Sequence, residues 1–161
     1  MIRRVLIVAA LLGASSVACR ADPRADLLHA KSSWEAHHLS KYSFVLVQRL
    51  PIIVAGRDRA IFGPINIIVR NGKRLRATIA SGGPSTDVGH SVPGSIKKYL
   101  PNNMDEIFNW VSKSLSETSG TREVVVTYDT TYGFPSKFSD TSSNTFDTDT
   151  FFEIVSFEAT P

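Results

Sequence analysis

Cysteine is almost absent from this chain, and its scarcity limits how the fold can be held together. Cys19 is the one cysteine among 161 residues, so no disulfide can form within the chain. Small secreted proteins that cannot build a sufficient core depend on several disulfides. This chain must instead be held by a hydrophobic core, which its length is sufficient to form.

Recognisable catalytic and metal-binding motifs are also missing. The sequence contains no G-x-S-x-G and no H-E-x-x-H motif. His29 and His37 lie eight residues apart on a predicted helix, which is too far for the i, i+4 pair of a helical zinc site. His38 is adjacent to His37 and points away from it, and His90 lies in a predicted loop. We therefore expect no metal and no cofactor.

Long hydrophobic runs are limited to residues 5–13, near the start of the chain. This run is too short to span a bilayer. Arg3 and Arg4 precede it and the small residues 14–18 follow it, which is the layout of a secretory signal peptide. The sequence therefore predicts a signal peptide over residues 1–18, a single domain over residues 19–161, and export to the bacterial periplasm or outer membrane.

Cys19 directly follows the predicted leader, and two interpretations of it stay open. In the first, Val17-Ala18-Cys19 belongs to a lipoprotein box and Cys19 becomes the acylated first residue, although Ser16 stands where leucine is usual. In the second, ordinary cleavage after Ala18 leaves a free thiol. We favour lipidation slightly, because a lone exposed thiol is a liability in an oxidising compartment. A lipid on Cys19 is then the only expected membrane contact.

Net charge gives no case for a nucleic-acid partner. Loss of the leader removes Arg3 and Arg4, which lowers the 18 basic residues to 16, against 15 acidic ones. The charges are nevertheless unevenly placed. Residues 41–79 hold eight basic residues and one acidic residue, whereas residues 117–161 hold eight acidic residues and two basic ones.

This asymmetry has two interpretations. A basic surface that includes Arg57, Arg59, Arg74 and Arg76 could bind the phosphates of anionic lipid or polysaccharide. Alternatively, the basic and acidic parts lie side by side and their charges pair across strands, each pair contributing little. We favour the pairing by a small margin.

Two helices are predicted from apolar residues at helical spacing. The first covers residues 22–39, where Leu27 and Trp34 share a face. The second has a capping box, in which Asn103 accepts a bond from the helix start and Glu106 reaches back. Five apolar residues then follow on one face: Met104, Ile107, Phe108, Val111 and Leu115. Gly120 is predicted to end this helix.

Alternating apolar and β-branched residues predict four strands, over residues 42–48, 65–69, 123–129 and 151–157. Residues 74–79 could pair back on the second strand after a tight turn at Asn71 and Gly72. Residues 130–149 are rich in turn formers. The order helix, two strands, helix, two strands predicts a single α+β domain. Its fold is a four-stranded antiparallel sheet in αββαββ order with the helices packed on one face.

The turn after the third predicted strand is the best candidate for a binding site. Gly133 can take a positive φ, Pro135 fixes the backbone that follows, and Asp129 can accept backbone N–H groups. With Tyr132 and Phe134 these residues form a rigid loop that could bind a peptide or a sugar. The same residues also suit a turn without any ligand, and we favour that simpler interpretation.

Residues 128–135, with the sequence YDTTYGFP, carry a resemblance to a known family. Together with Trp34 and with Gly63-Pro64, they resemble an uncharacterised family of small bacterial secreted proteins and lipoproteins that has a "YD…YG-aromatic-P" motif. Members often carry two cysteines just after the first strand, where this chain has none, so no redox or metal role tied to that pair is expected. The resemblance implies a fold and a compartment, and no reaction.

These observations predict an exported envelope protein that is not an enzyme and that binds a protein or an envelope-surface partner. The alternative is an enzyme of hydrolytic or transfer activity whose residues come together only in the fold. Such an enzyme should have a closed polar pocket on which at least two titratable groups converge.

Overall fold

The computed structural model describes residues 22–50, 60–80, 88–117, 120–143 and 149–160. In this part of the chain there are three helices: α1 (Pro23–Ala36), α2 (Gly94–Lys97) and α3 (Met104–Ser116). The strands are β1 (Lys41–Leu50), β2 (Ala60–Arg70), β3 (Lys73–Ile79), β4 (Arg122–Tyr128), β5 (Pro135–Ser142) and β6 (Thr150–Ala159). The predicted signal peptide and Cys19 lie outside the described residues.

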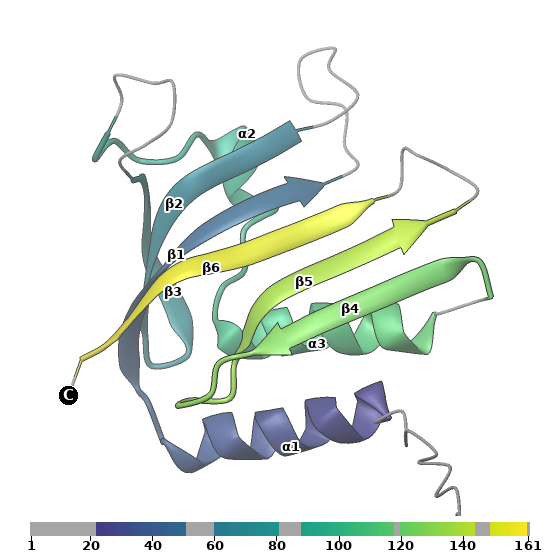
Figure 1. The fold of residues 1–161 in the computed structure, drawn as a ribbon. Coiled ribbons are helices and arrows are strands. Elements are labelled where there is room, and N and C mark those ends of the chain that lie inside the picture. Colours follow the sequence, from purple (N-terminus) through teal and green to yellow (C-terminus); the bar gives the residue numbers. More distant parts are fainter. Residues whose placement is uncertain (1–21, 51–59, 81–87, 118–119, 144–148, 161) are drawn as a thin grey trace, which may run out of the picture.

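The strands form one antiparallel sheet in the order β3-β2-β1-β6-β5-β4 (Figure 1). The prediction of a four-stranded sheet in αββαββ order is therefore wrong, because the sheet has six strands. Two strands had been left out of the predicted order. Residues 74–79 do pair back on β2, as β3, and β5 lies in the stretch that was predicted to be turns.

Strand β5 forms although its sequence, PSKFSDTS, is rich in turn-forming residues. Its side chains alternate, so that Phe138 and Asp140 are buried on one face at 1% and 2% exposure. β4 pairs with one of its edges and β6 with the other. Pairing on both edges and burial of one face outweigh its weak local preference for a strand.

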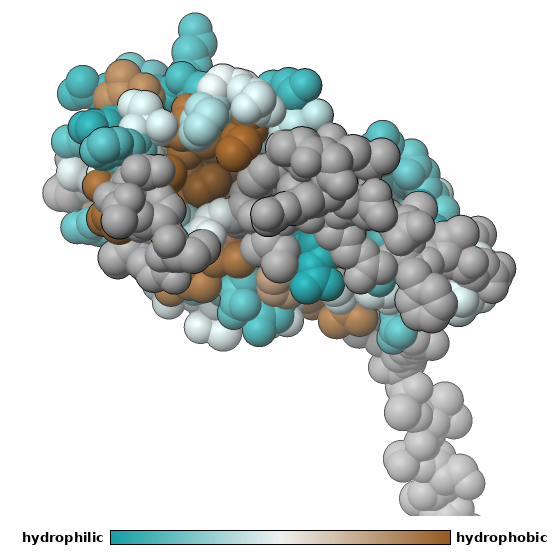
Figure 2. Space-filling model, turned by 90° about the horizontal axis from the view of Figure 1, so that it is seen from above, coloured by the Kyte–Doolittle hydropathy of each residue, from teal (hydrophilic) through white to brown (hydrophobic). Residues whose placement is uncertain are grey.

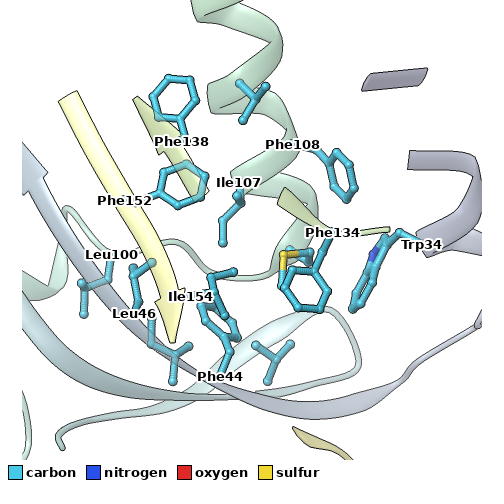
Figure 3. Close-up of a cluster of buried hydrophobic side chains, with 14 of the residues drawn as sticks. Trp34, Phe44, Leu46, Leu100, Ile107, Phe108, Phe134, Phe138, Phe152 and Ile154 are labelled. Carbon is cyan, nitrogen blue, oxygen red and sulfur yellow. The ribbon is translucent and has the colours of Figure 1, made fainter. Parts of the chain in front are cut away.

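The helices cover one face of the sheet, and Figure 1 looks onto the opposite, helix-free face. In Figure 3, Phe44, Phe138 and Phe152 from the sheet cluster with Ile107 and Phe108 from α3. Each of these side chains is at most 2% exposed. Burial of one such side chain contributes roughly 1.5–3 kcal/mol, so this layer supplies much of the stability that no disulfide provides.

Both predicted helix faces are confirmed. Leu27, Ala30 and Trp34 of α1 are buried, and α1 ends at Ala36, three residues before its predicted end. The five predicted apolar residues of α3 are all buried as well. Among the described residues, no helix combines the length and the hydrophobicity that crossing a membrane requires.

The start of α3 is tied to β1. The Asn103 side chain accepts a hydrogen bond from the Glu106 backbone N–H at 2.9 Å, as predicted. Glu106 reaches back to the backbone N–H of Asn102 at 2.7 Å, one residue earlier than a capping box requires. The Met104 N–H donates to the Tyr42 hydroxyl at 2.9 Å. Burial raises the pKa of Tyr42 to about 12, so this hydroxyl stays neutral and anchors α3 on the sheet.

Candidate functional site

The predicted binding turn between β4 and β5 is closed by its own hydrogen bonds. The Asp129 side chain accepts from the backbone N–H groups of Thr131 and Tyr132 at 2.9 and 2.7 Å. The Gly133 N–H donates to the Asp129 carbonyl oxygen at 3.0 Å, and the Asp129 N–H donates to the Phe134 carbonyl oxygen at 2.8 Å. The carboxylate of Asp129 is thus used inside the turn.

This turn lies directly against α1. Gly133 has a φ of 82°, and a Cβ atom there would lie 2.6 Å from the Ala30 carbonyl oxygen and 2.8 Å from the Ser33 Cβ atom. His37 Nε2 is hydrogen-bonded to the Thr131 carbonyl oxygen at 3.0 Å. Only a glycine permits this approach, so the turn joins the β4–β5 hairpin to the helix.

The aromatic residues of the turn face the protein itself. Phe134 is 2% exposed, and its ring centroid is 4.7 Å from that of Phe157 and 6.1 Å from that of Trp34. The half-buried Tyr132 ring lies 4.9 Å from His37. Pro135 begins β5 and is buried. The contacts of Tyr132, Phe134 and Pro135 within the protein give each of them a structural role. Ligand binding by this turn stays a prediction.

A large cavity lies beside the turn, between α1 and β4, and we call it the α1–β4 cleft. It has a volume of about 710 Å³. Figure 1 shows α1 running alongside β4 at this edge of the sheet. The cleft is lined by α1 with its N-cap, by one residue of α3 and by β4: Asp22, Pro23, Arg24, Asp26, Leu115, Arg122, Glu123, Val124, Val125, Val126 and Tyr128.

A second cavity, of about 340 Å³, continues the cleft toward the turn. Asp26 and Tyr128 line both cavities, while Ala30, Ser33 and Gly133 line only the second. Because Gly133 touches α1 at this point, the turn closes one end of the groove between helix and strand. The turn between β4 and β5 therefore contacts α1 at the end of this groove.

The two arginines of the cleft are held by other groups. Arg122 donates through Nε to the Asp140 carboxylate at 3.0 Å and makes a second bond through its Nη2. The Arg24 guanidinium donates to the Leu115 carbonyl oxygen at 3.3 Å. Among the described residues, neither Asp26 nor Glu123 has an ion-pair partner. The Leu115 carbonyl oxygen is neutral, so Arg24 keeps its positive charge. Asp22, Asp26 and Glu123 outnumber it, and the charges on the cleft walls that have no ion-pair partner among the described residues are therefore negative in sum.

Tyr128 lies at the junction of the two cavities. Its hydroxyl is buried and has no hydrogen-bond partner. Burial, with a smaller contribution from the negative charge of Asp26, raises the pKa of Tyr128 to about 12. The phenol therefore stays neutral at physiological pH and cannot serve there as a base.

The predicted basic surface is only partly described. Arg57 and Arg59 lie outside the described residues. The Arg74 guanidinium donates to the carbonyl oxygens of Leu100 and Pro101 at 2.6 and 3.1 Å, and burial lowers its pKa. Arg76 is exposed opposite Ile68, whereas Arg74 lies opposite Val69, so the two arginines are on different faces of the sheet.

Part of the basic region, residues 41–79, lies beside part of the acidic region, residues 117–161, but the described residues show no cross-strand ion pair between the two regions. β1, from the basic part, pairs with β6, from the acidic part. The cross-strand ion pairs among the described residues, Arg122–Asp140 and Lys137–Glu153, both lie within the acidic part. No group of three or more potential metal ligands is present in the part of the chain that the structure describes.

Two further cavities lie away from α1. Seen from above, hydrophobic residues gather in a hollow among hydrophilic ones (Figure 2). A cavity of about 510 Å³ lies over Ser43, Asn66 and Glu158 on the helix-free face, and one of about 320 Å³ lies beside Trp110 and Phe152. Sequence reasoning missed the α1–β4 cleft, because the cleft exists only if β4 is the last strand of the sheet.

Substitution of Gly133 tests the joint between the turn and α1. We expect Gly133→Ala to lower the free energy of unfolding by at least about 2 kcal/mol, because it adds strain at positive φ and a clash with Ala30. Gly120→Ala is the matched control, since a Cβ atom there meets nothing within 4 Å. Urea unfolding followed by circular dichroism measures both, and equal midpoints for the two variants would contradict the joint.

Alkaline titration tests the environment of Tyr128. We expect a tyrosinate absorbance component near pH 12 from Tyr42 and Tyr128, which Tyr128→Phe reduces by about half. Because its pKa is raised from 10.0, Tyr128 contributes fully to stability below pH 10, and this contribution is lost as the pH rises to about 12. Rapid mixing keeps the protein folded during the measurement. If Tyr128→Phe left the absorbance change near pH 12 unchanged, the raised pKa of Tyr128 would be refuted.

Comparison with known proteins places the chain in a family. No curated protein and no solved structure matches it. A family model described as a family of unknown function (DUF6174) matches residues 26–159, from the first turn of α1 to the end of β6. Since this match covers most of the chain, the protein belongs to this family of unknown function.

Proposed function

We propose that the protein is an exported, non-catalytic binding protein that takes up a protein partner in the α1–β4 cleft. The observation that carries this proposal is the position of a cavity of about 710 Å³ beside the edge strand β4. Its inner wall is apolar, with Leu115, Val124 and Val126, and the charges that have no ion-pair partner among the described residues, among them Asp26 and Glu123, are negative in sum. An apolar centre with a polar rim is the usual anatomy of a protein interface.

The chemistry of the cleft supports binding over catalysis. A general acid or base works best with a pKa near the operating pH. Tyr128 is shifted away from that range, to about 12, and Arg122 is engaged by the buried Asp140. The cleft is open along β4, whereas an enzyme that excludes water needs a closed pocket.

The export of the protein rests on residues 1–18. Their two arginines, short apolar run and small residues have the layout of a signal peptide. A binding protein of the envelope can be attached through a lipid on Cys19, and the described domain then presents the cleft to partners outside the cytoplasm.

A photo-crosslinking amino acid tests the cleft as the binding surface. Val125 lines the cleft and is 51% exposed, and Leu75, 66% exposed on the opposite edge strand β3, is the matched control. We expect a crosslinker at Val125, in the full-length chain in its native cells, to give a discrete adduct. The same crosslinker at Leu75 should give none. Equal adduct patterns at the two positions would exclude the cleft as the specific surface.

Mass spectrometry of the mature N-terminus tests export and anchoring together. We expect the chain recovered from the envelope fraction to begin at Cys19 with a mass gain of diacylglycerol size. Cys19→Ser should release the protein from the membrane fraction. An N-terminus that still carries Arg3 and Arg4 would overturn export, and an unmodified Cys19 would overturn the anchor alone.

A further inference from the structure

Strand β4 presents one set of backbone groups to β5 and the other set to the cleft. The Ser143 N–H donates to the Thr121 carbonyl oxygen at 3.0 Å, and these two residues continue the β4–β5 register by one pair. In an antiparallel ladder, hydrogen-bonded pairs alternate with non-bonded pairs. The N–H and C=O groups of Glu123, Val125 and Thr127 therefore point toward β5.

The alternate residues of β4 then point their backbone groups outward, toward the cleft. These residues are Arg122, Val124 and Val126, and no strand of the described residues pairs with them. An unpaired strand edge is a template for another extended chain. Neighbouring strands in a sheet lie about 4.8 Å apart. A chain that pairs with the outer edge of β4 would therefore run directly beside β4, in the cleft between β4 and α1.

The charges that line the cleft indicate which kind of chain could pair with the edge of β4. Asp22 and Asp26, from the start of α1, and Glu123 of β4 line the cleft without ion-pair partners in the described part of the chain. Arg122 is paired with Asp140, so Arg24 is the one basic residue of the lining that is not in an ion pair, and the negative charges exceed it. A second copy of this chain, pairing β4 with β4, would bring two such acidic walls together. An incoming segment with basic side chains is complementary to these walls.

We propose that an extended, basic segment of a partner protein adds to β4 as a further strand of the sheet. Its backbone pairs with Arg122, Val124 and Val126, and its apolar residues meet Leu115. Its Lys or Arg side chains lie near Asp26 and Glu123. This inference rests on the proposed function, and it specifies the partner as a strand-forming basic peptide.

Amide exchange resolved by NMR tests the mode of binding. The probe is a synthetic peptide of alternating Lys and Val, matched to the seven residues of β4, added to the protein purified after expression of the full-length chain. We expect at least about tenfold slower exchange at Arg122, Val124 and Val126. The amides of Glu123, Val125 and Thr127, already bonded to β5, are the internal control and should change less.

Methylation of the peptide backbone provides a second, independent measurement. Two peptides carry N-methyl groups on alternate residues, one set blocking the edge-facing N–H groups and the other leaving them free. Strand addition predicts that one peptide loses binding and the other keeps it. Equal affinity of the two would overturn the proposal, as would protection confined to residues outside β4.

Variants test the charges and the strand edge. Asp26→Asn and Glu123→Gln should each lower the affinity for the Lys-Val peptide by about two- to fivefold, and this loss of affinity should be smaller at high salt. Glu158→Gln, on the helix-free face, is the control and should have no effect. Val124→Pro removes an outward N–H that β5 does not use, so it should abolish binding while the protein stays folded.

The outcomes separate this inference from the proposed function. Protection of the outward amides without peptide would overturn the inference, and size-exclusion chromatography would then tell a second copy from a segment of the same chain. A crosslinked adduct at Val125 without peptide binding would overturn strand addition and leave the proposed function standing. Absence of both the adduct and peptide binding would overturn both.

Discussion

At Gly133 the turn between β4 and β5 approaches α1 so closely that a Cβ atom would lie 2.6 Å from the Ala30 carbonyl oxygen. This contact sets where the helix lies relative to the edge strand. Phe134 anchors the turn in the core through its contacts with Trp34 and Phe157. The Asp129 side chain fixes the conformation of the turn by accepting a hydrogen bond from the Tyr132 N–H. The cleft is the space that remains between helix and strand beyond this joint.

The rest of the sheet provides a rigid base for that joint. β1 and β6, the first and last strands, pair at its centre, so the two ends of the domain stabilise each other. The apolar face of α3 covers the centre of the sheet, and its start is tied to Tyr42. Without a disulfide, these packed layers carry the stability, and β4 is left with one edge unpaired among the described residues.

Local pattern was sufficient for the helices and for the strands with alternating apolar residues. The five-residue stripe of α3 and its cap at Asn103 formed as predicted, because both depend on residues close together in sequence. Strand β5 was missed, because Ser136 and Asp140 favour turns when they are considered alone. Its strand conformation comes from partners far along the chain, and Asp140 is tolerated in the interior because Arg122 pairs with it.

The sequence by itself determined the composition of the core, the glycine that a close contact needs, the leader-like start and the absence of any disulfide within the chain. Only the tertiary structure decided that β4 is an edge strand, that its turn docks on α1 and that both arginines of the cleft are engaged. Strand order and the space between elements depend on long-range pairing, which the local alternation of side chains does not encode.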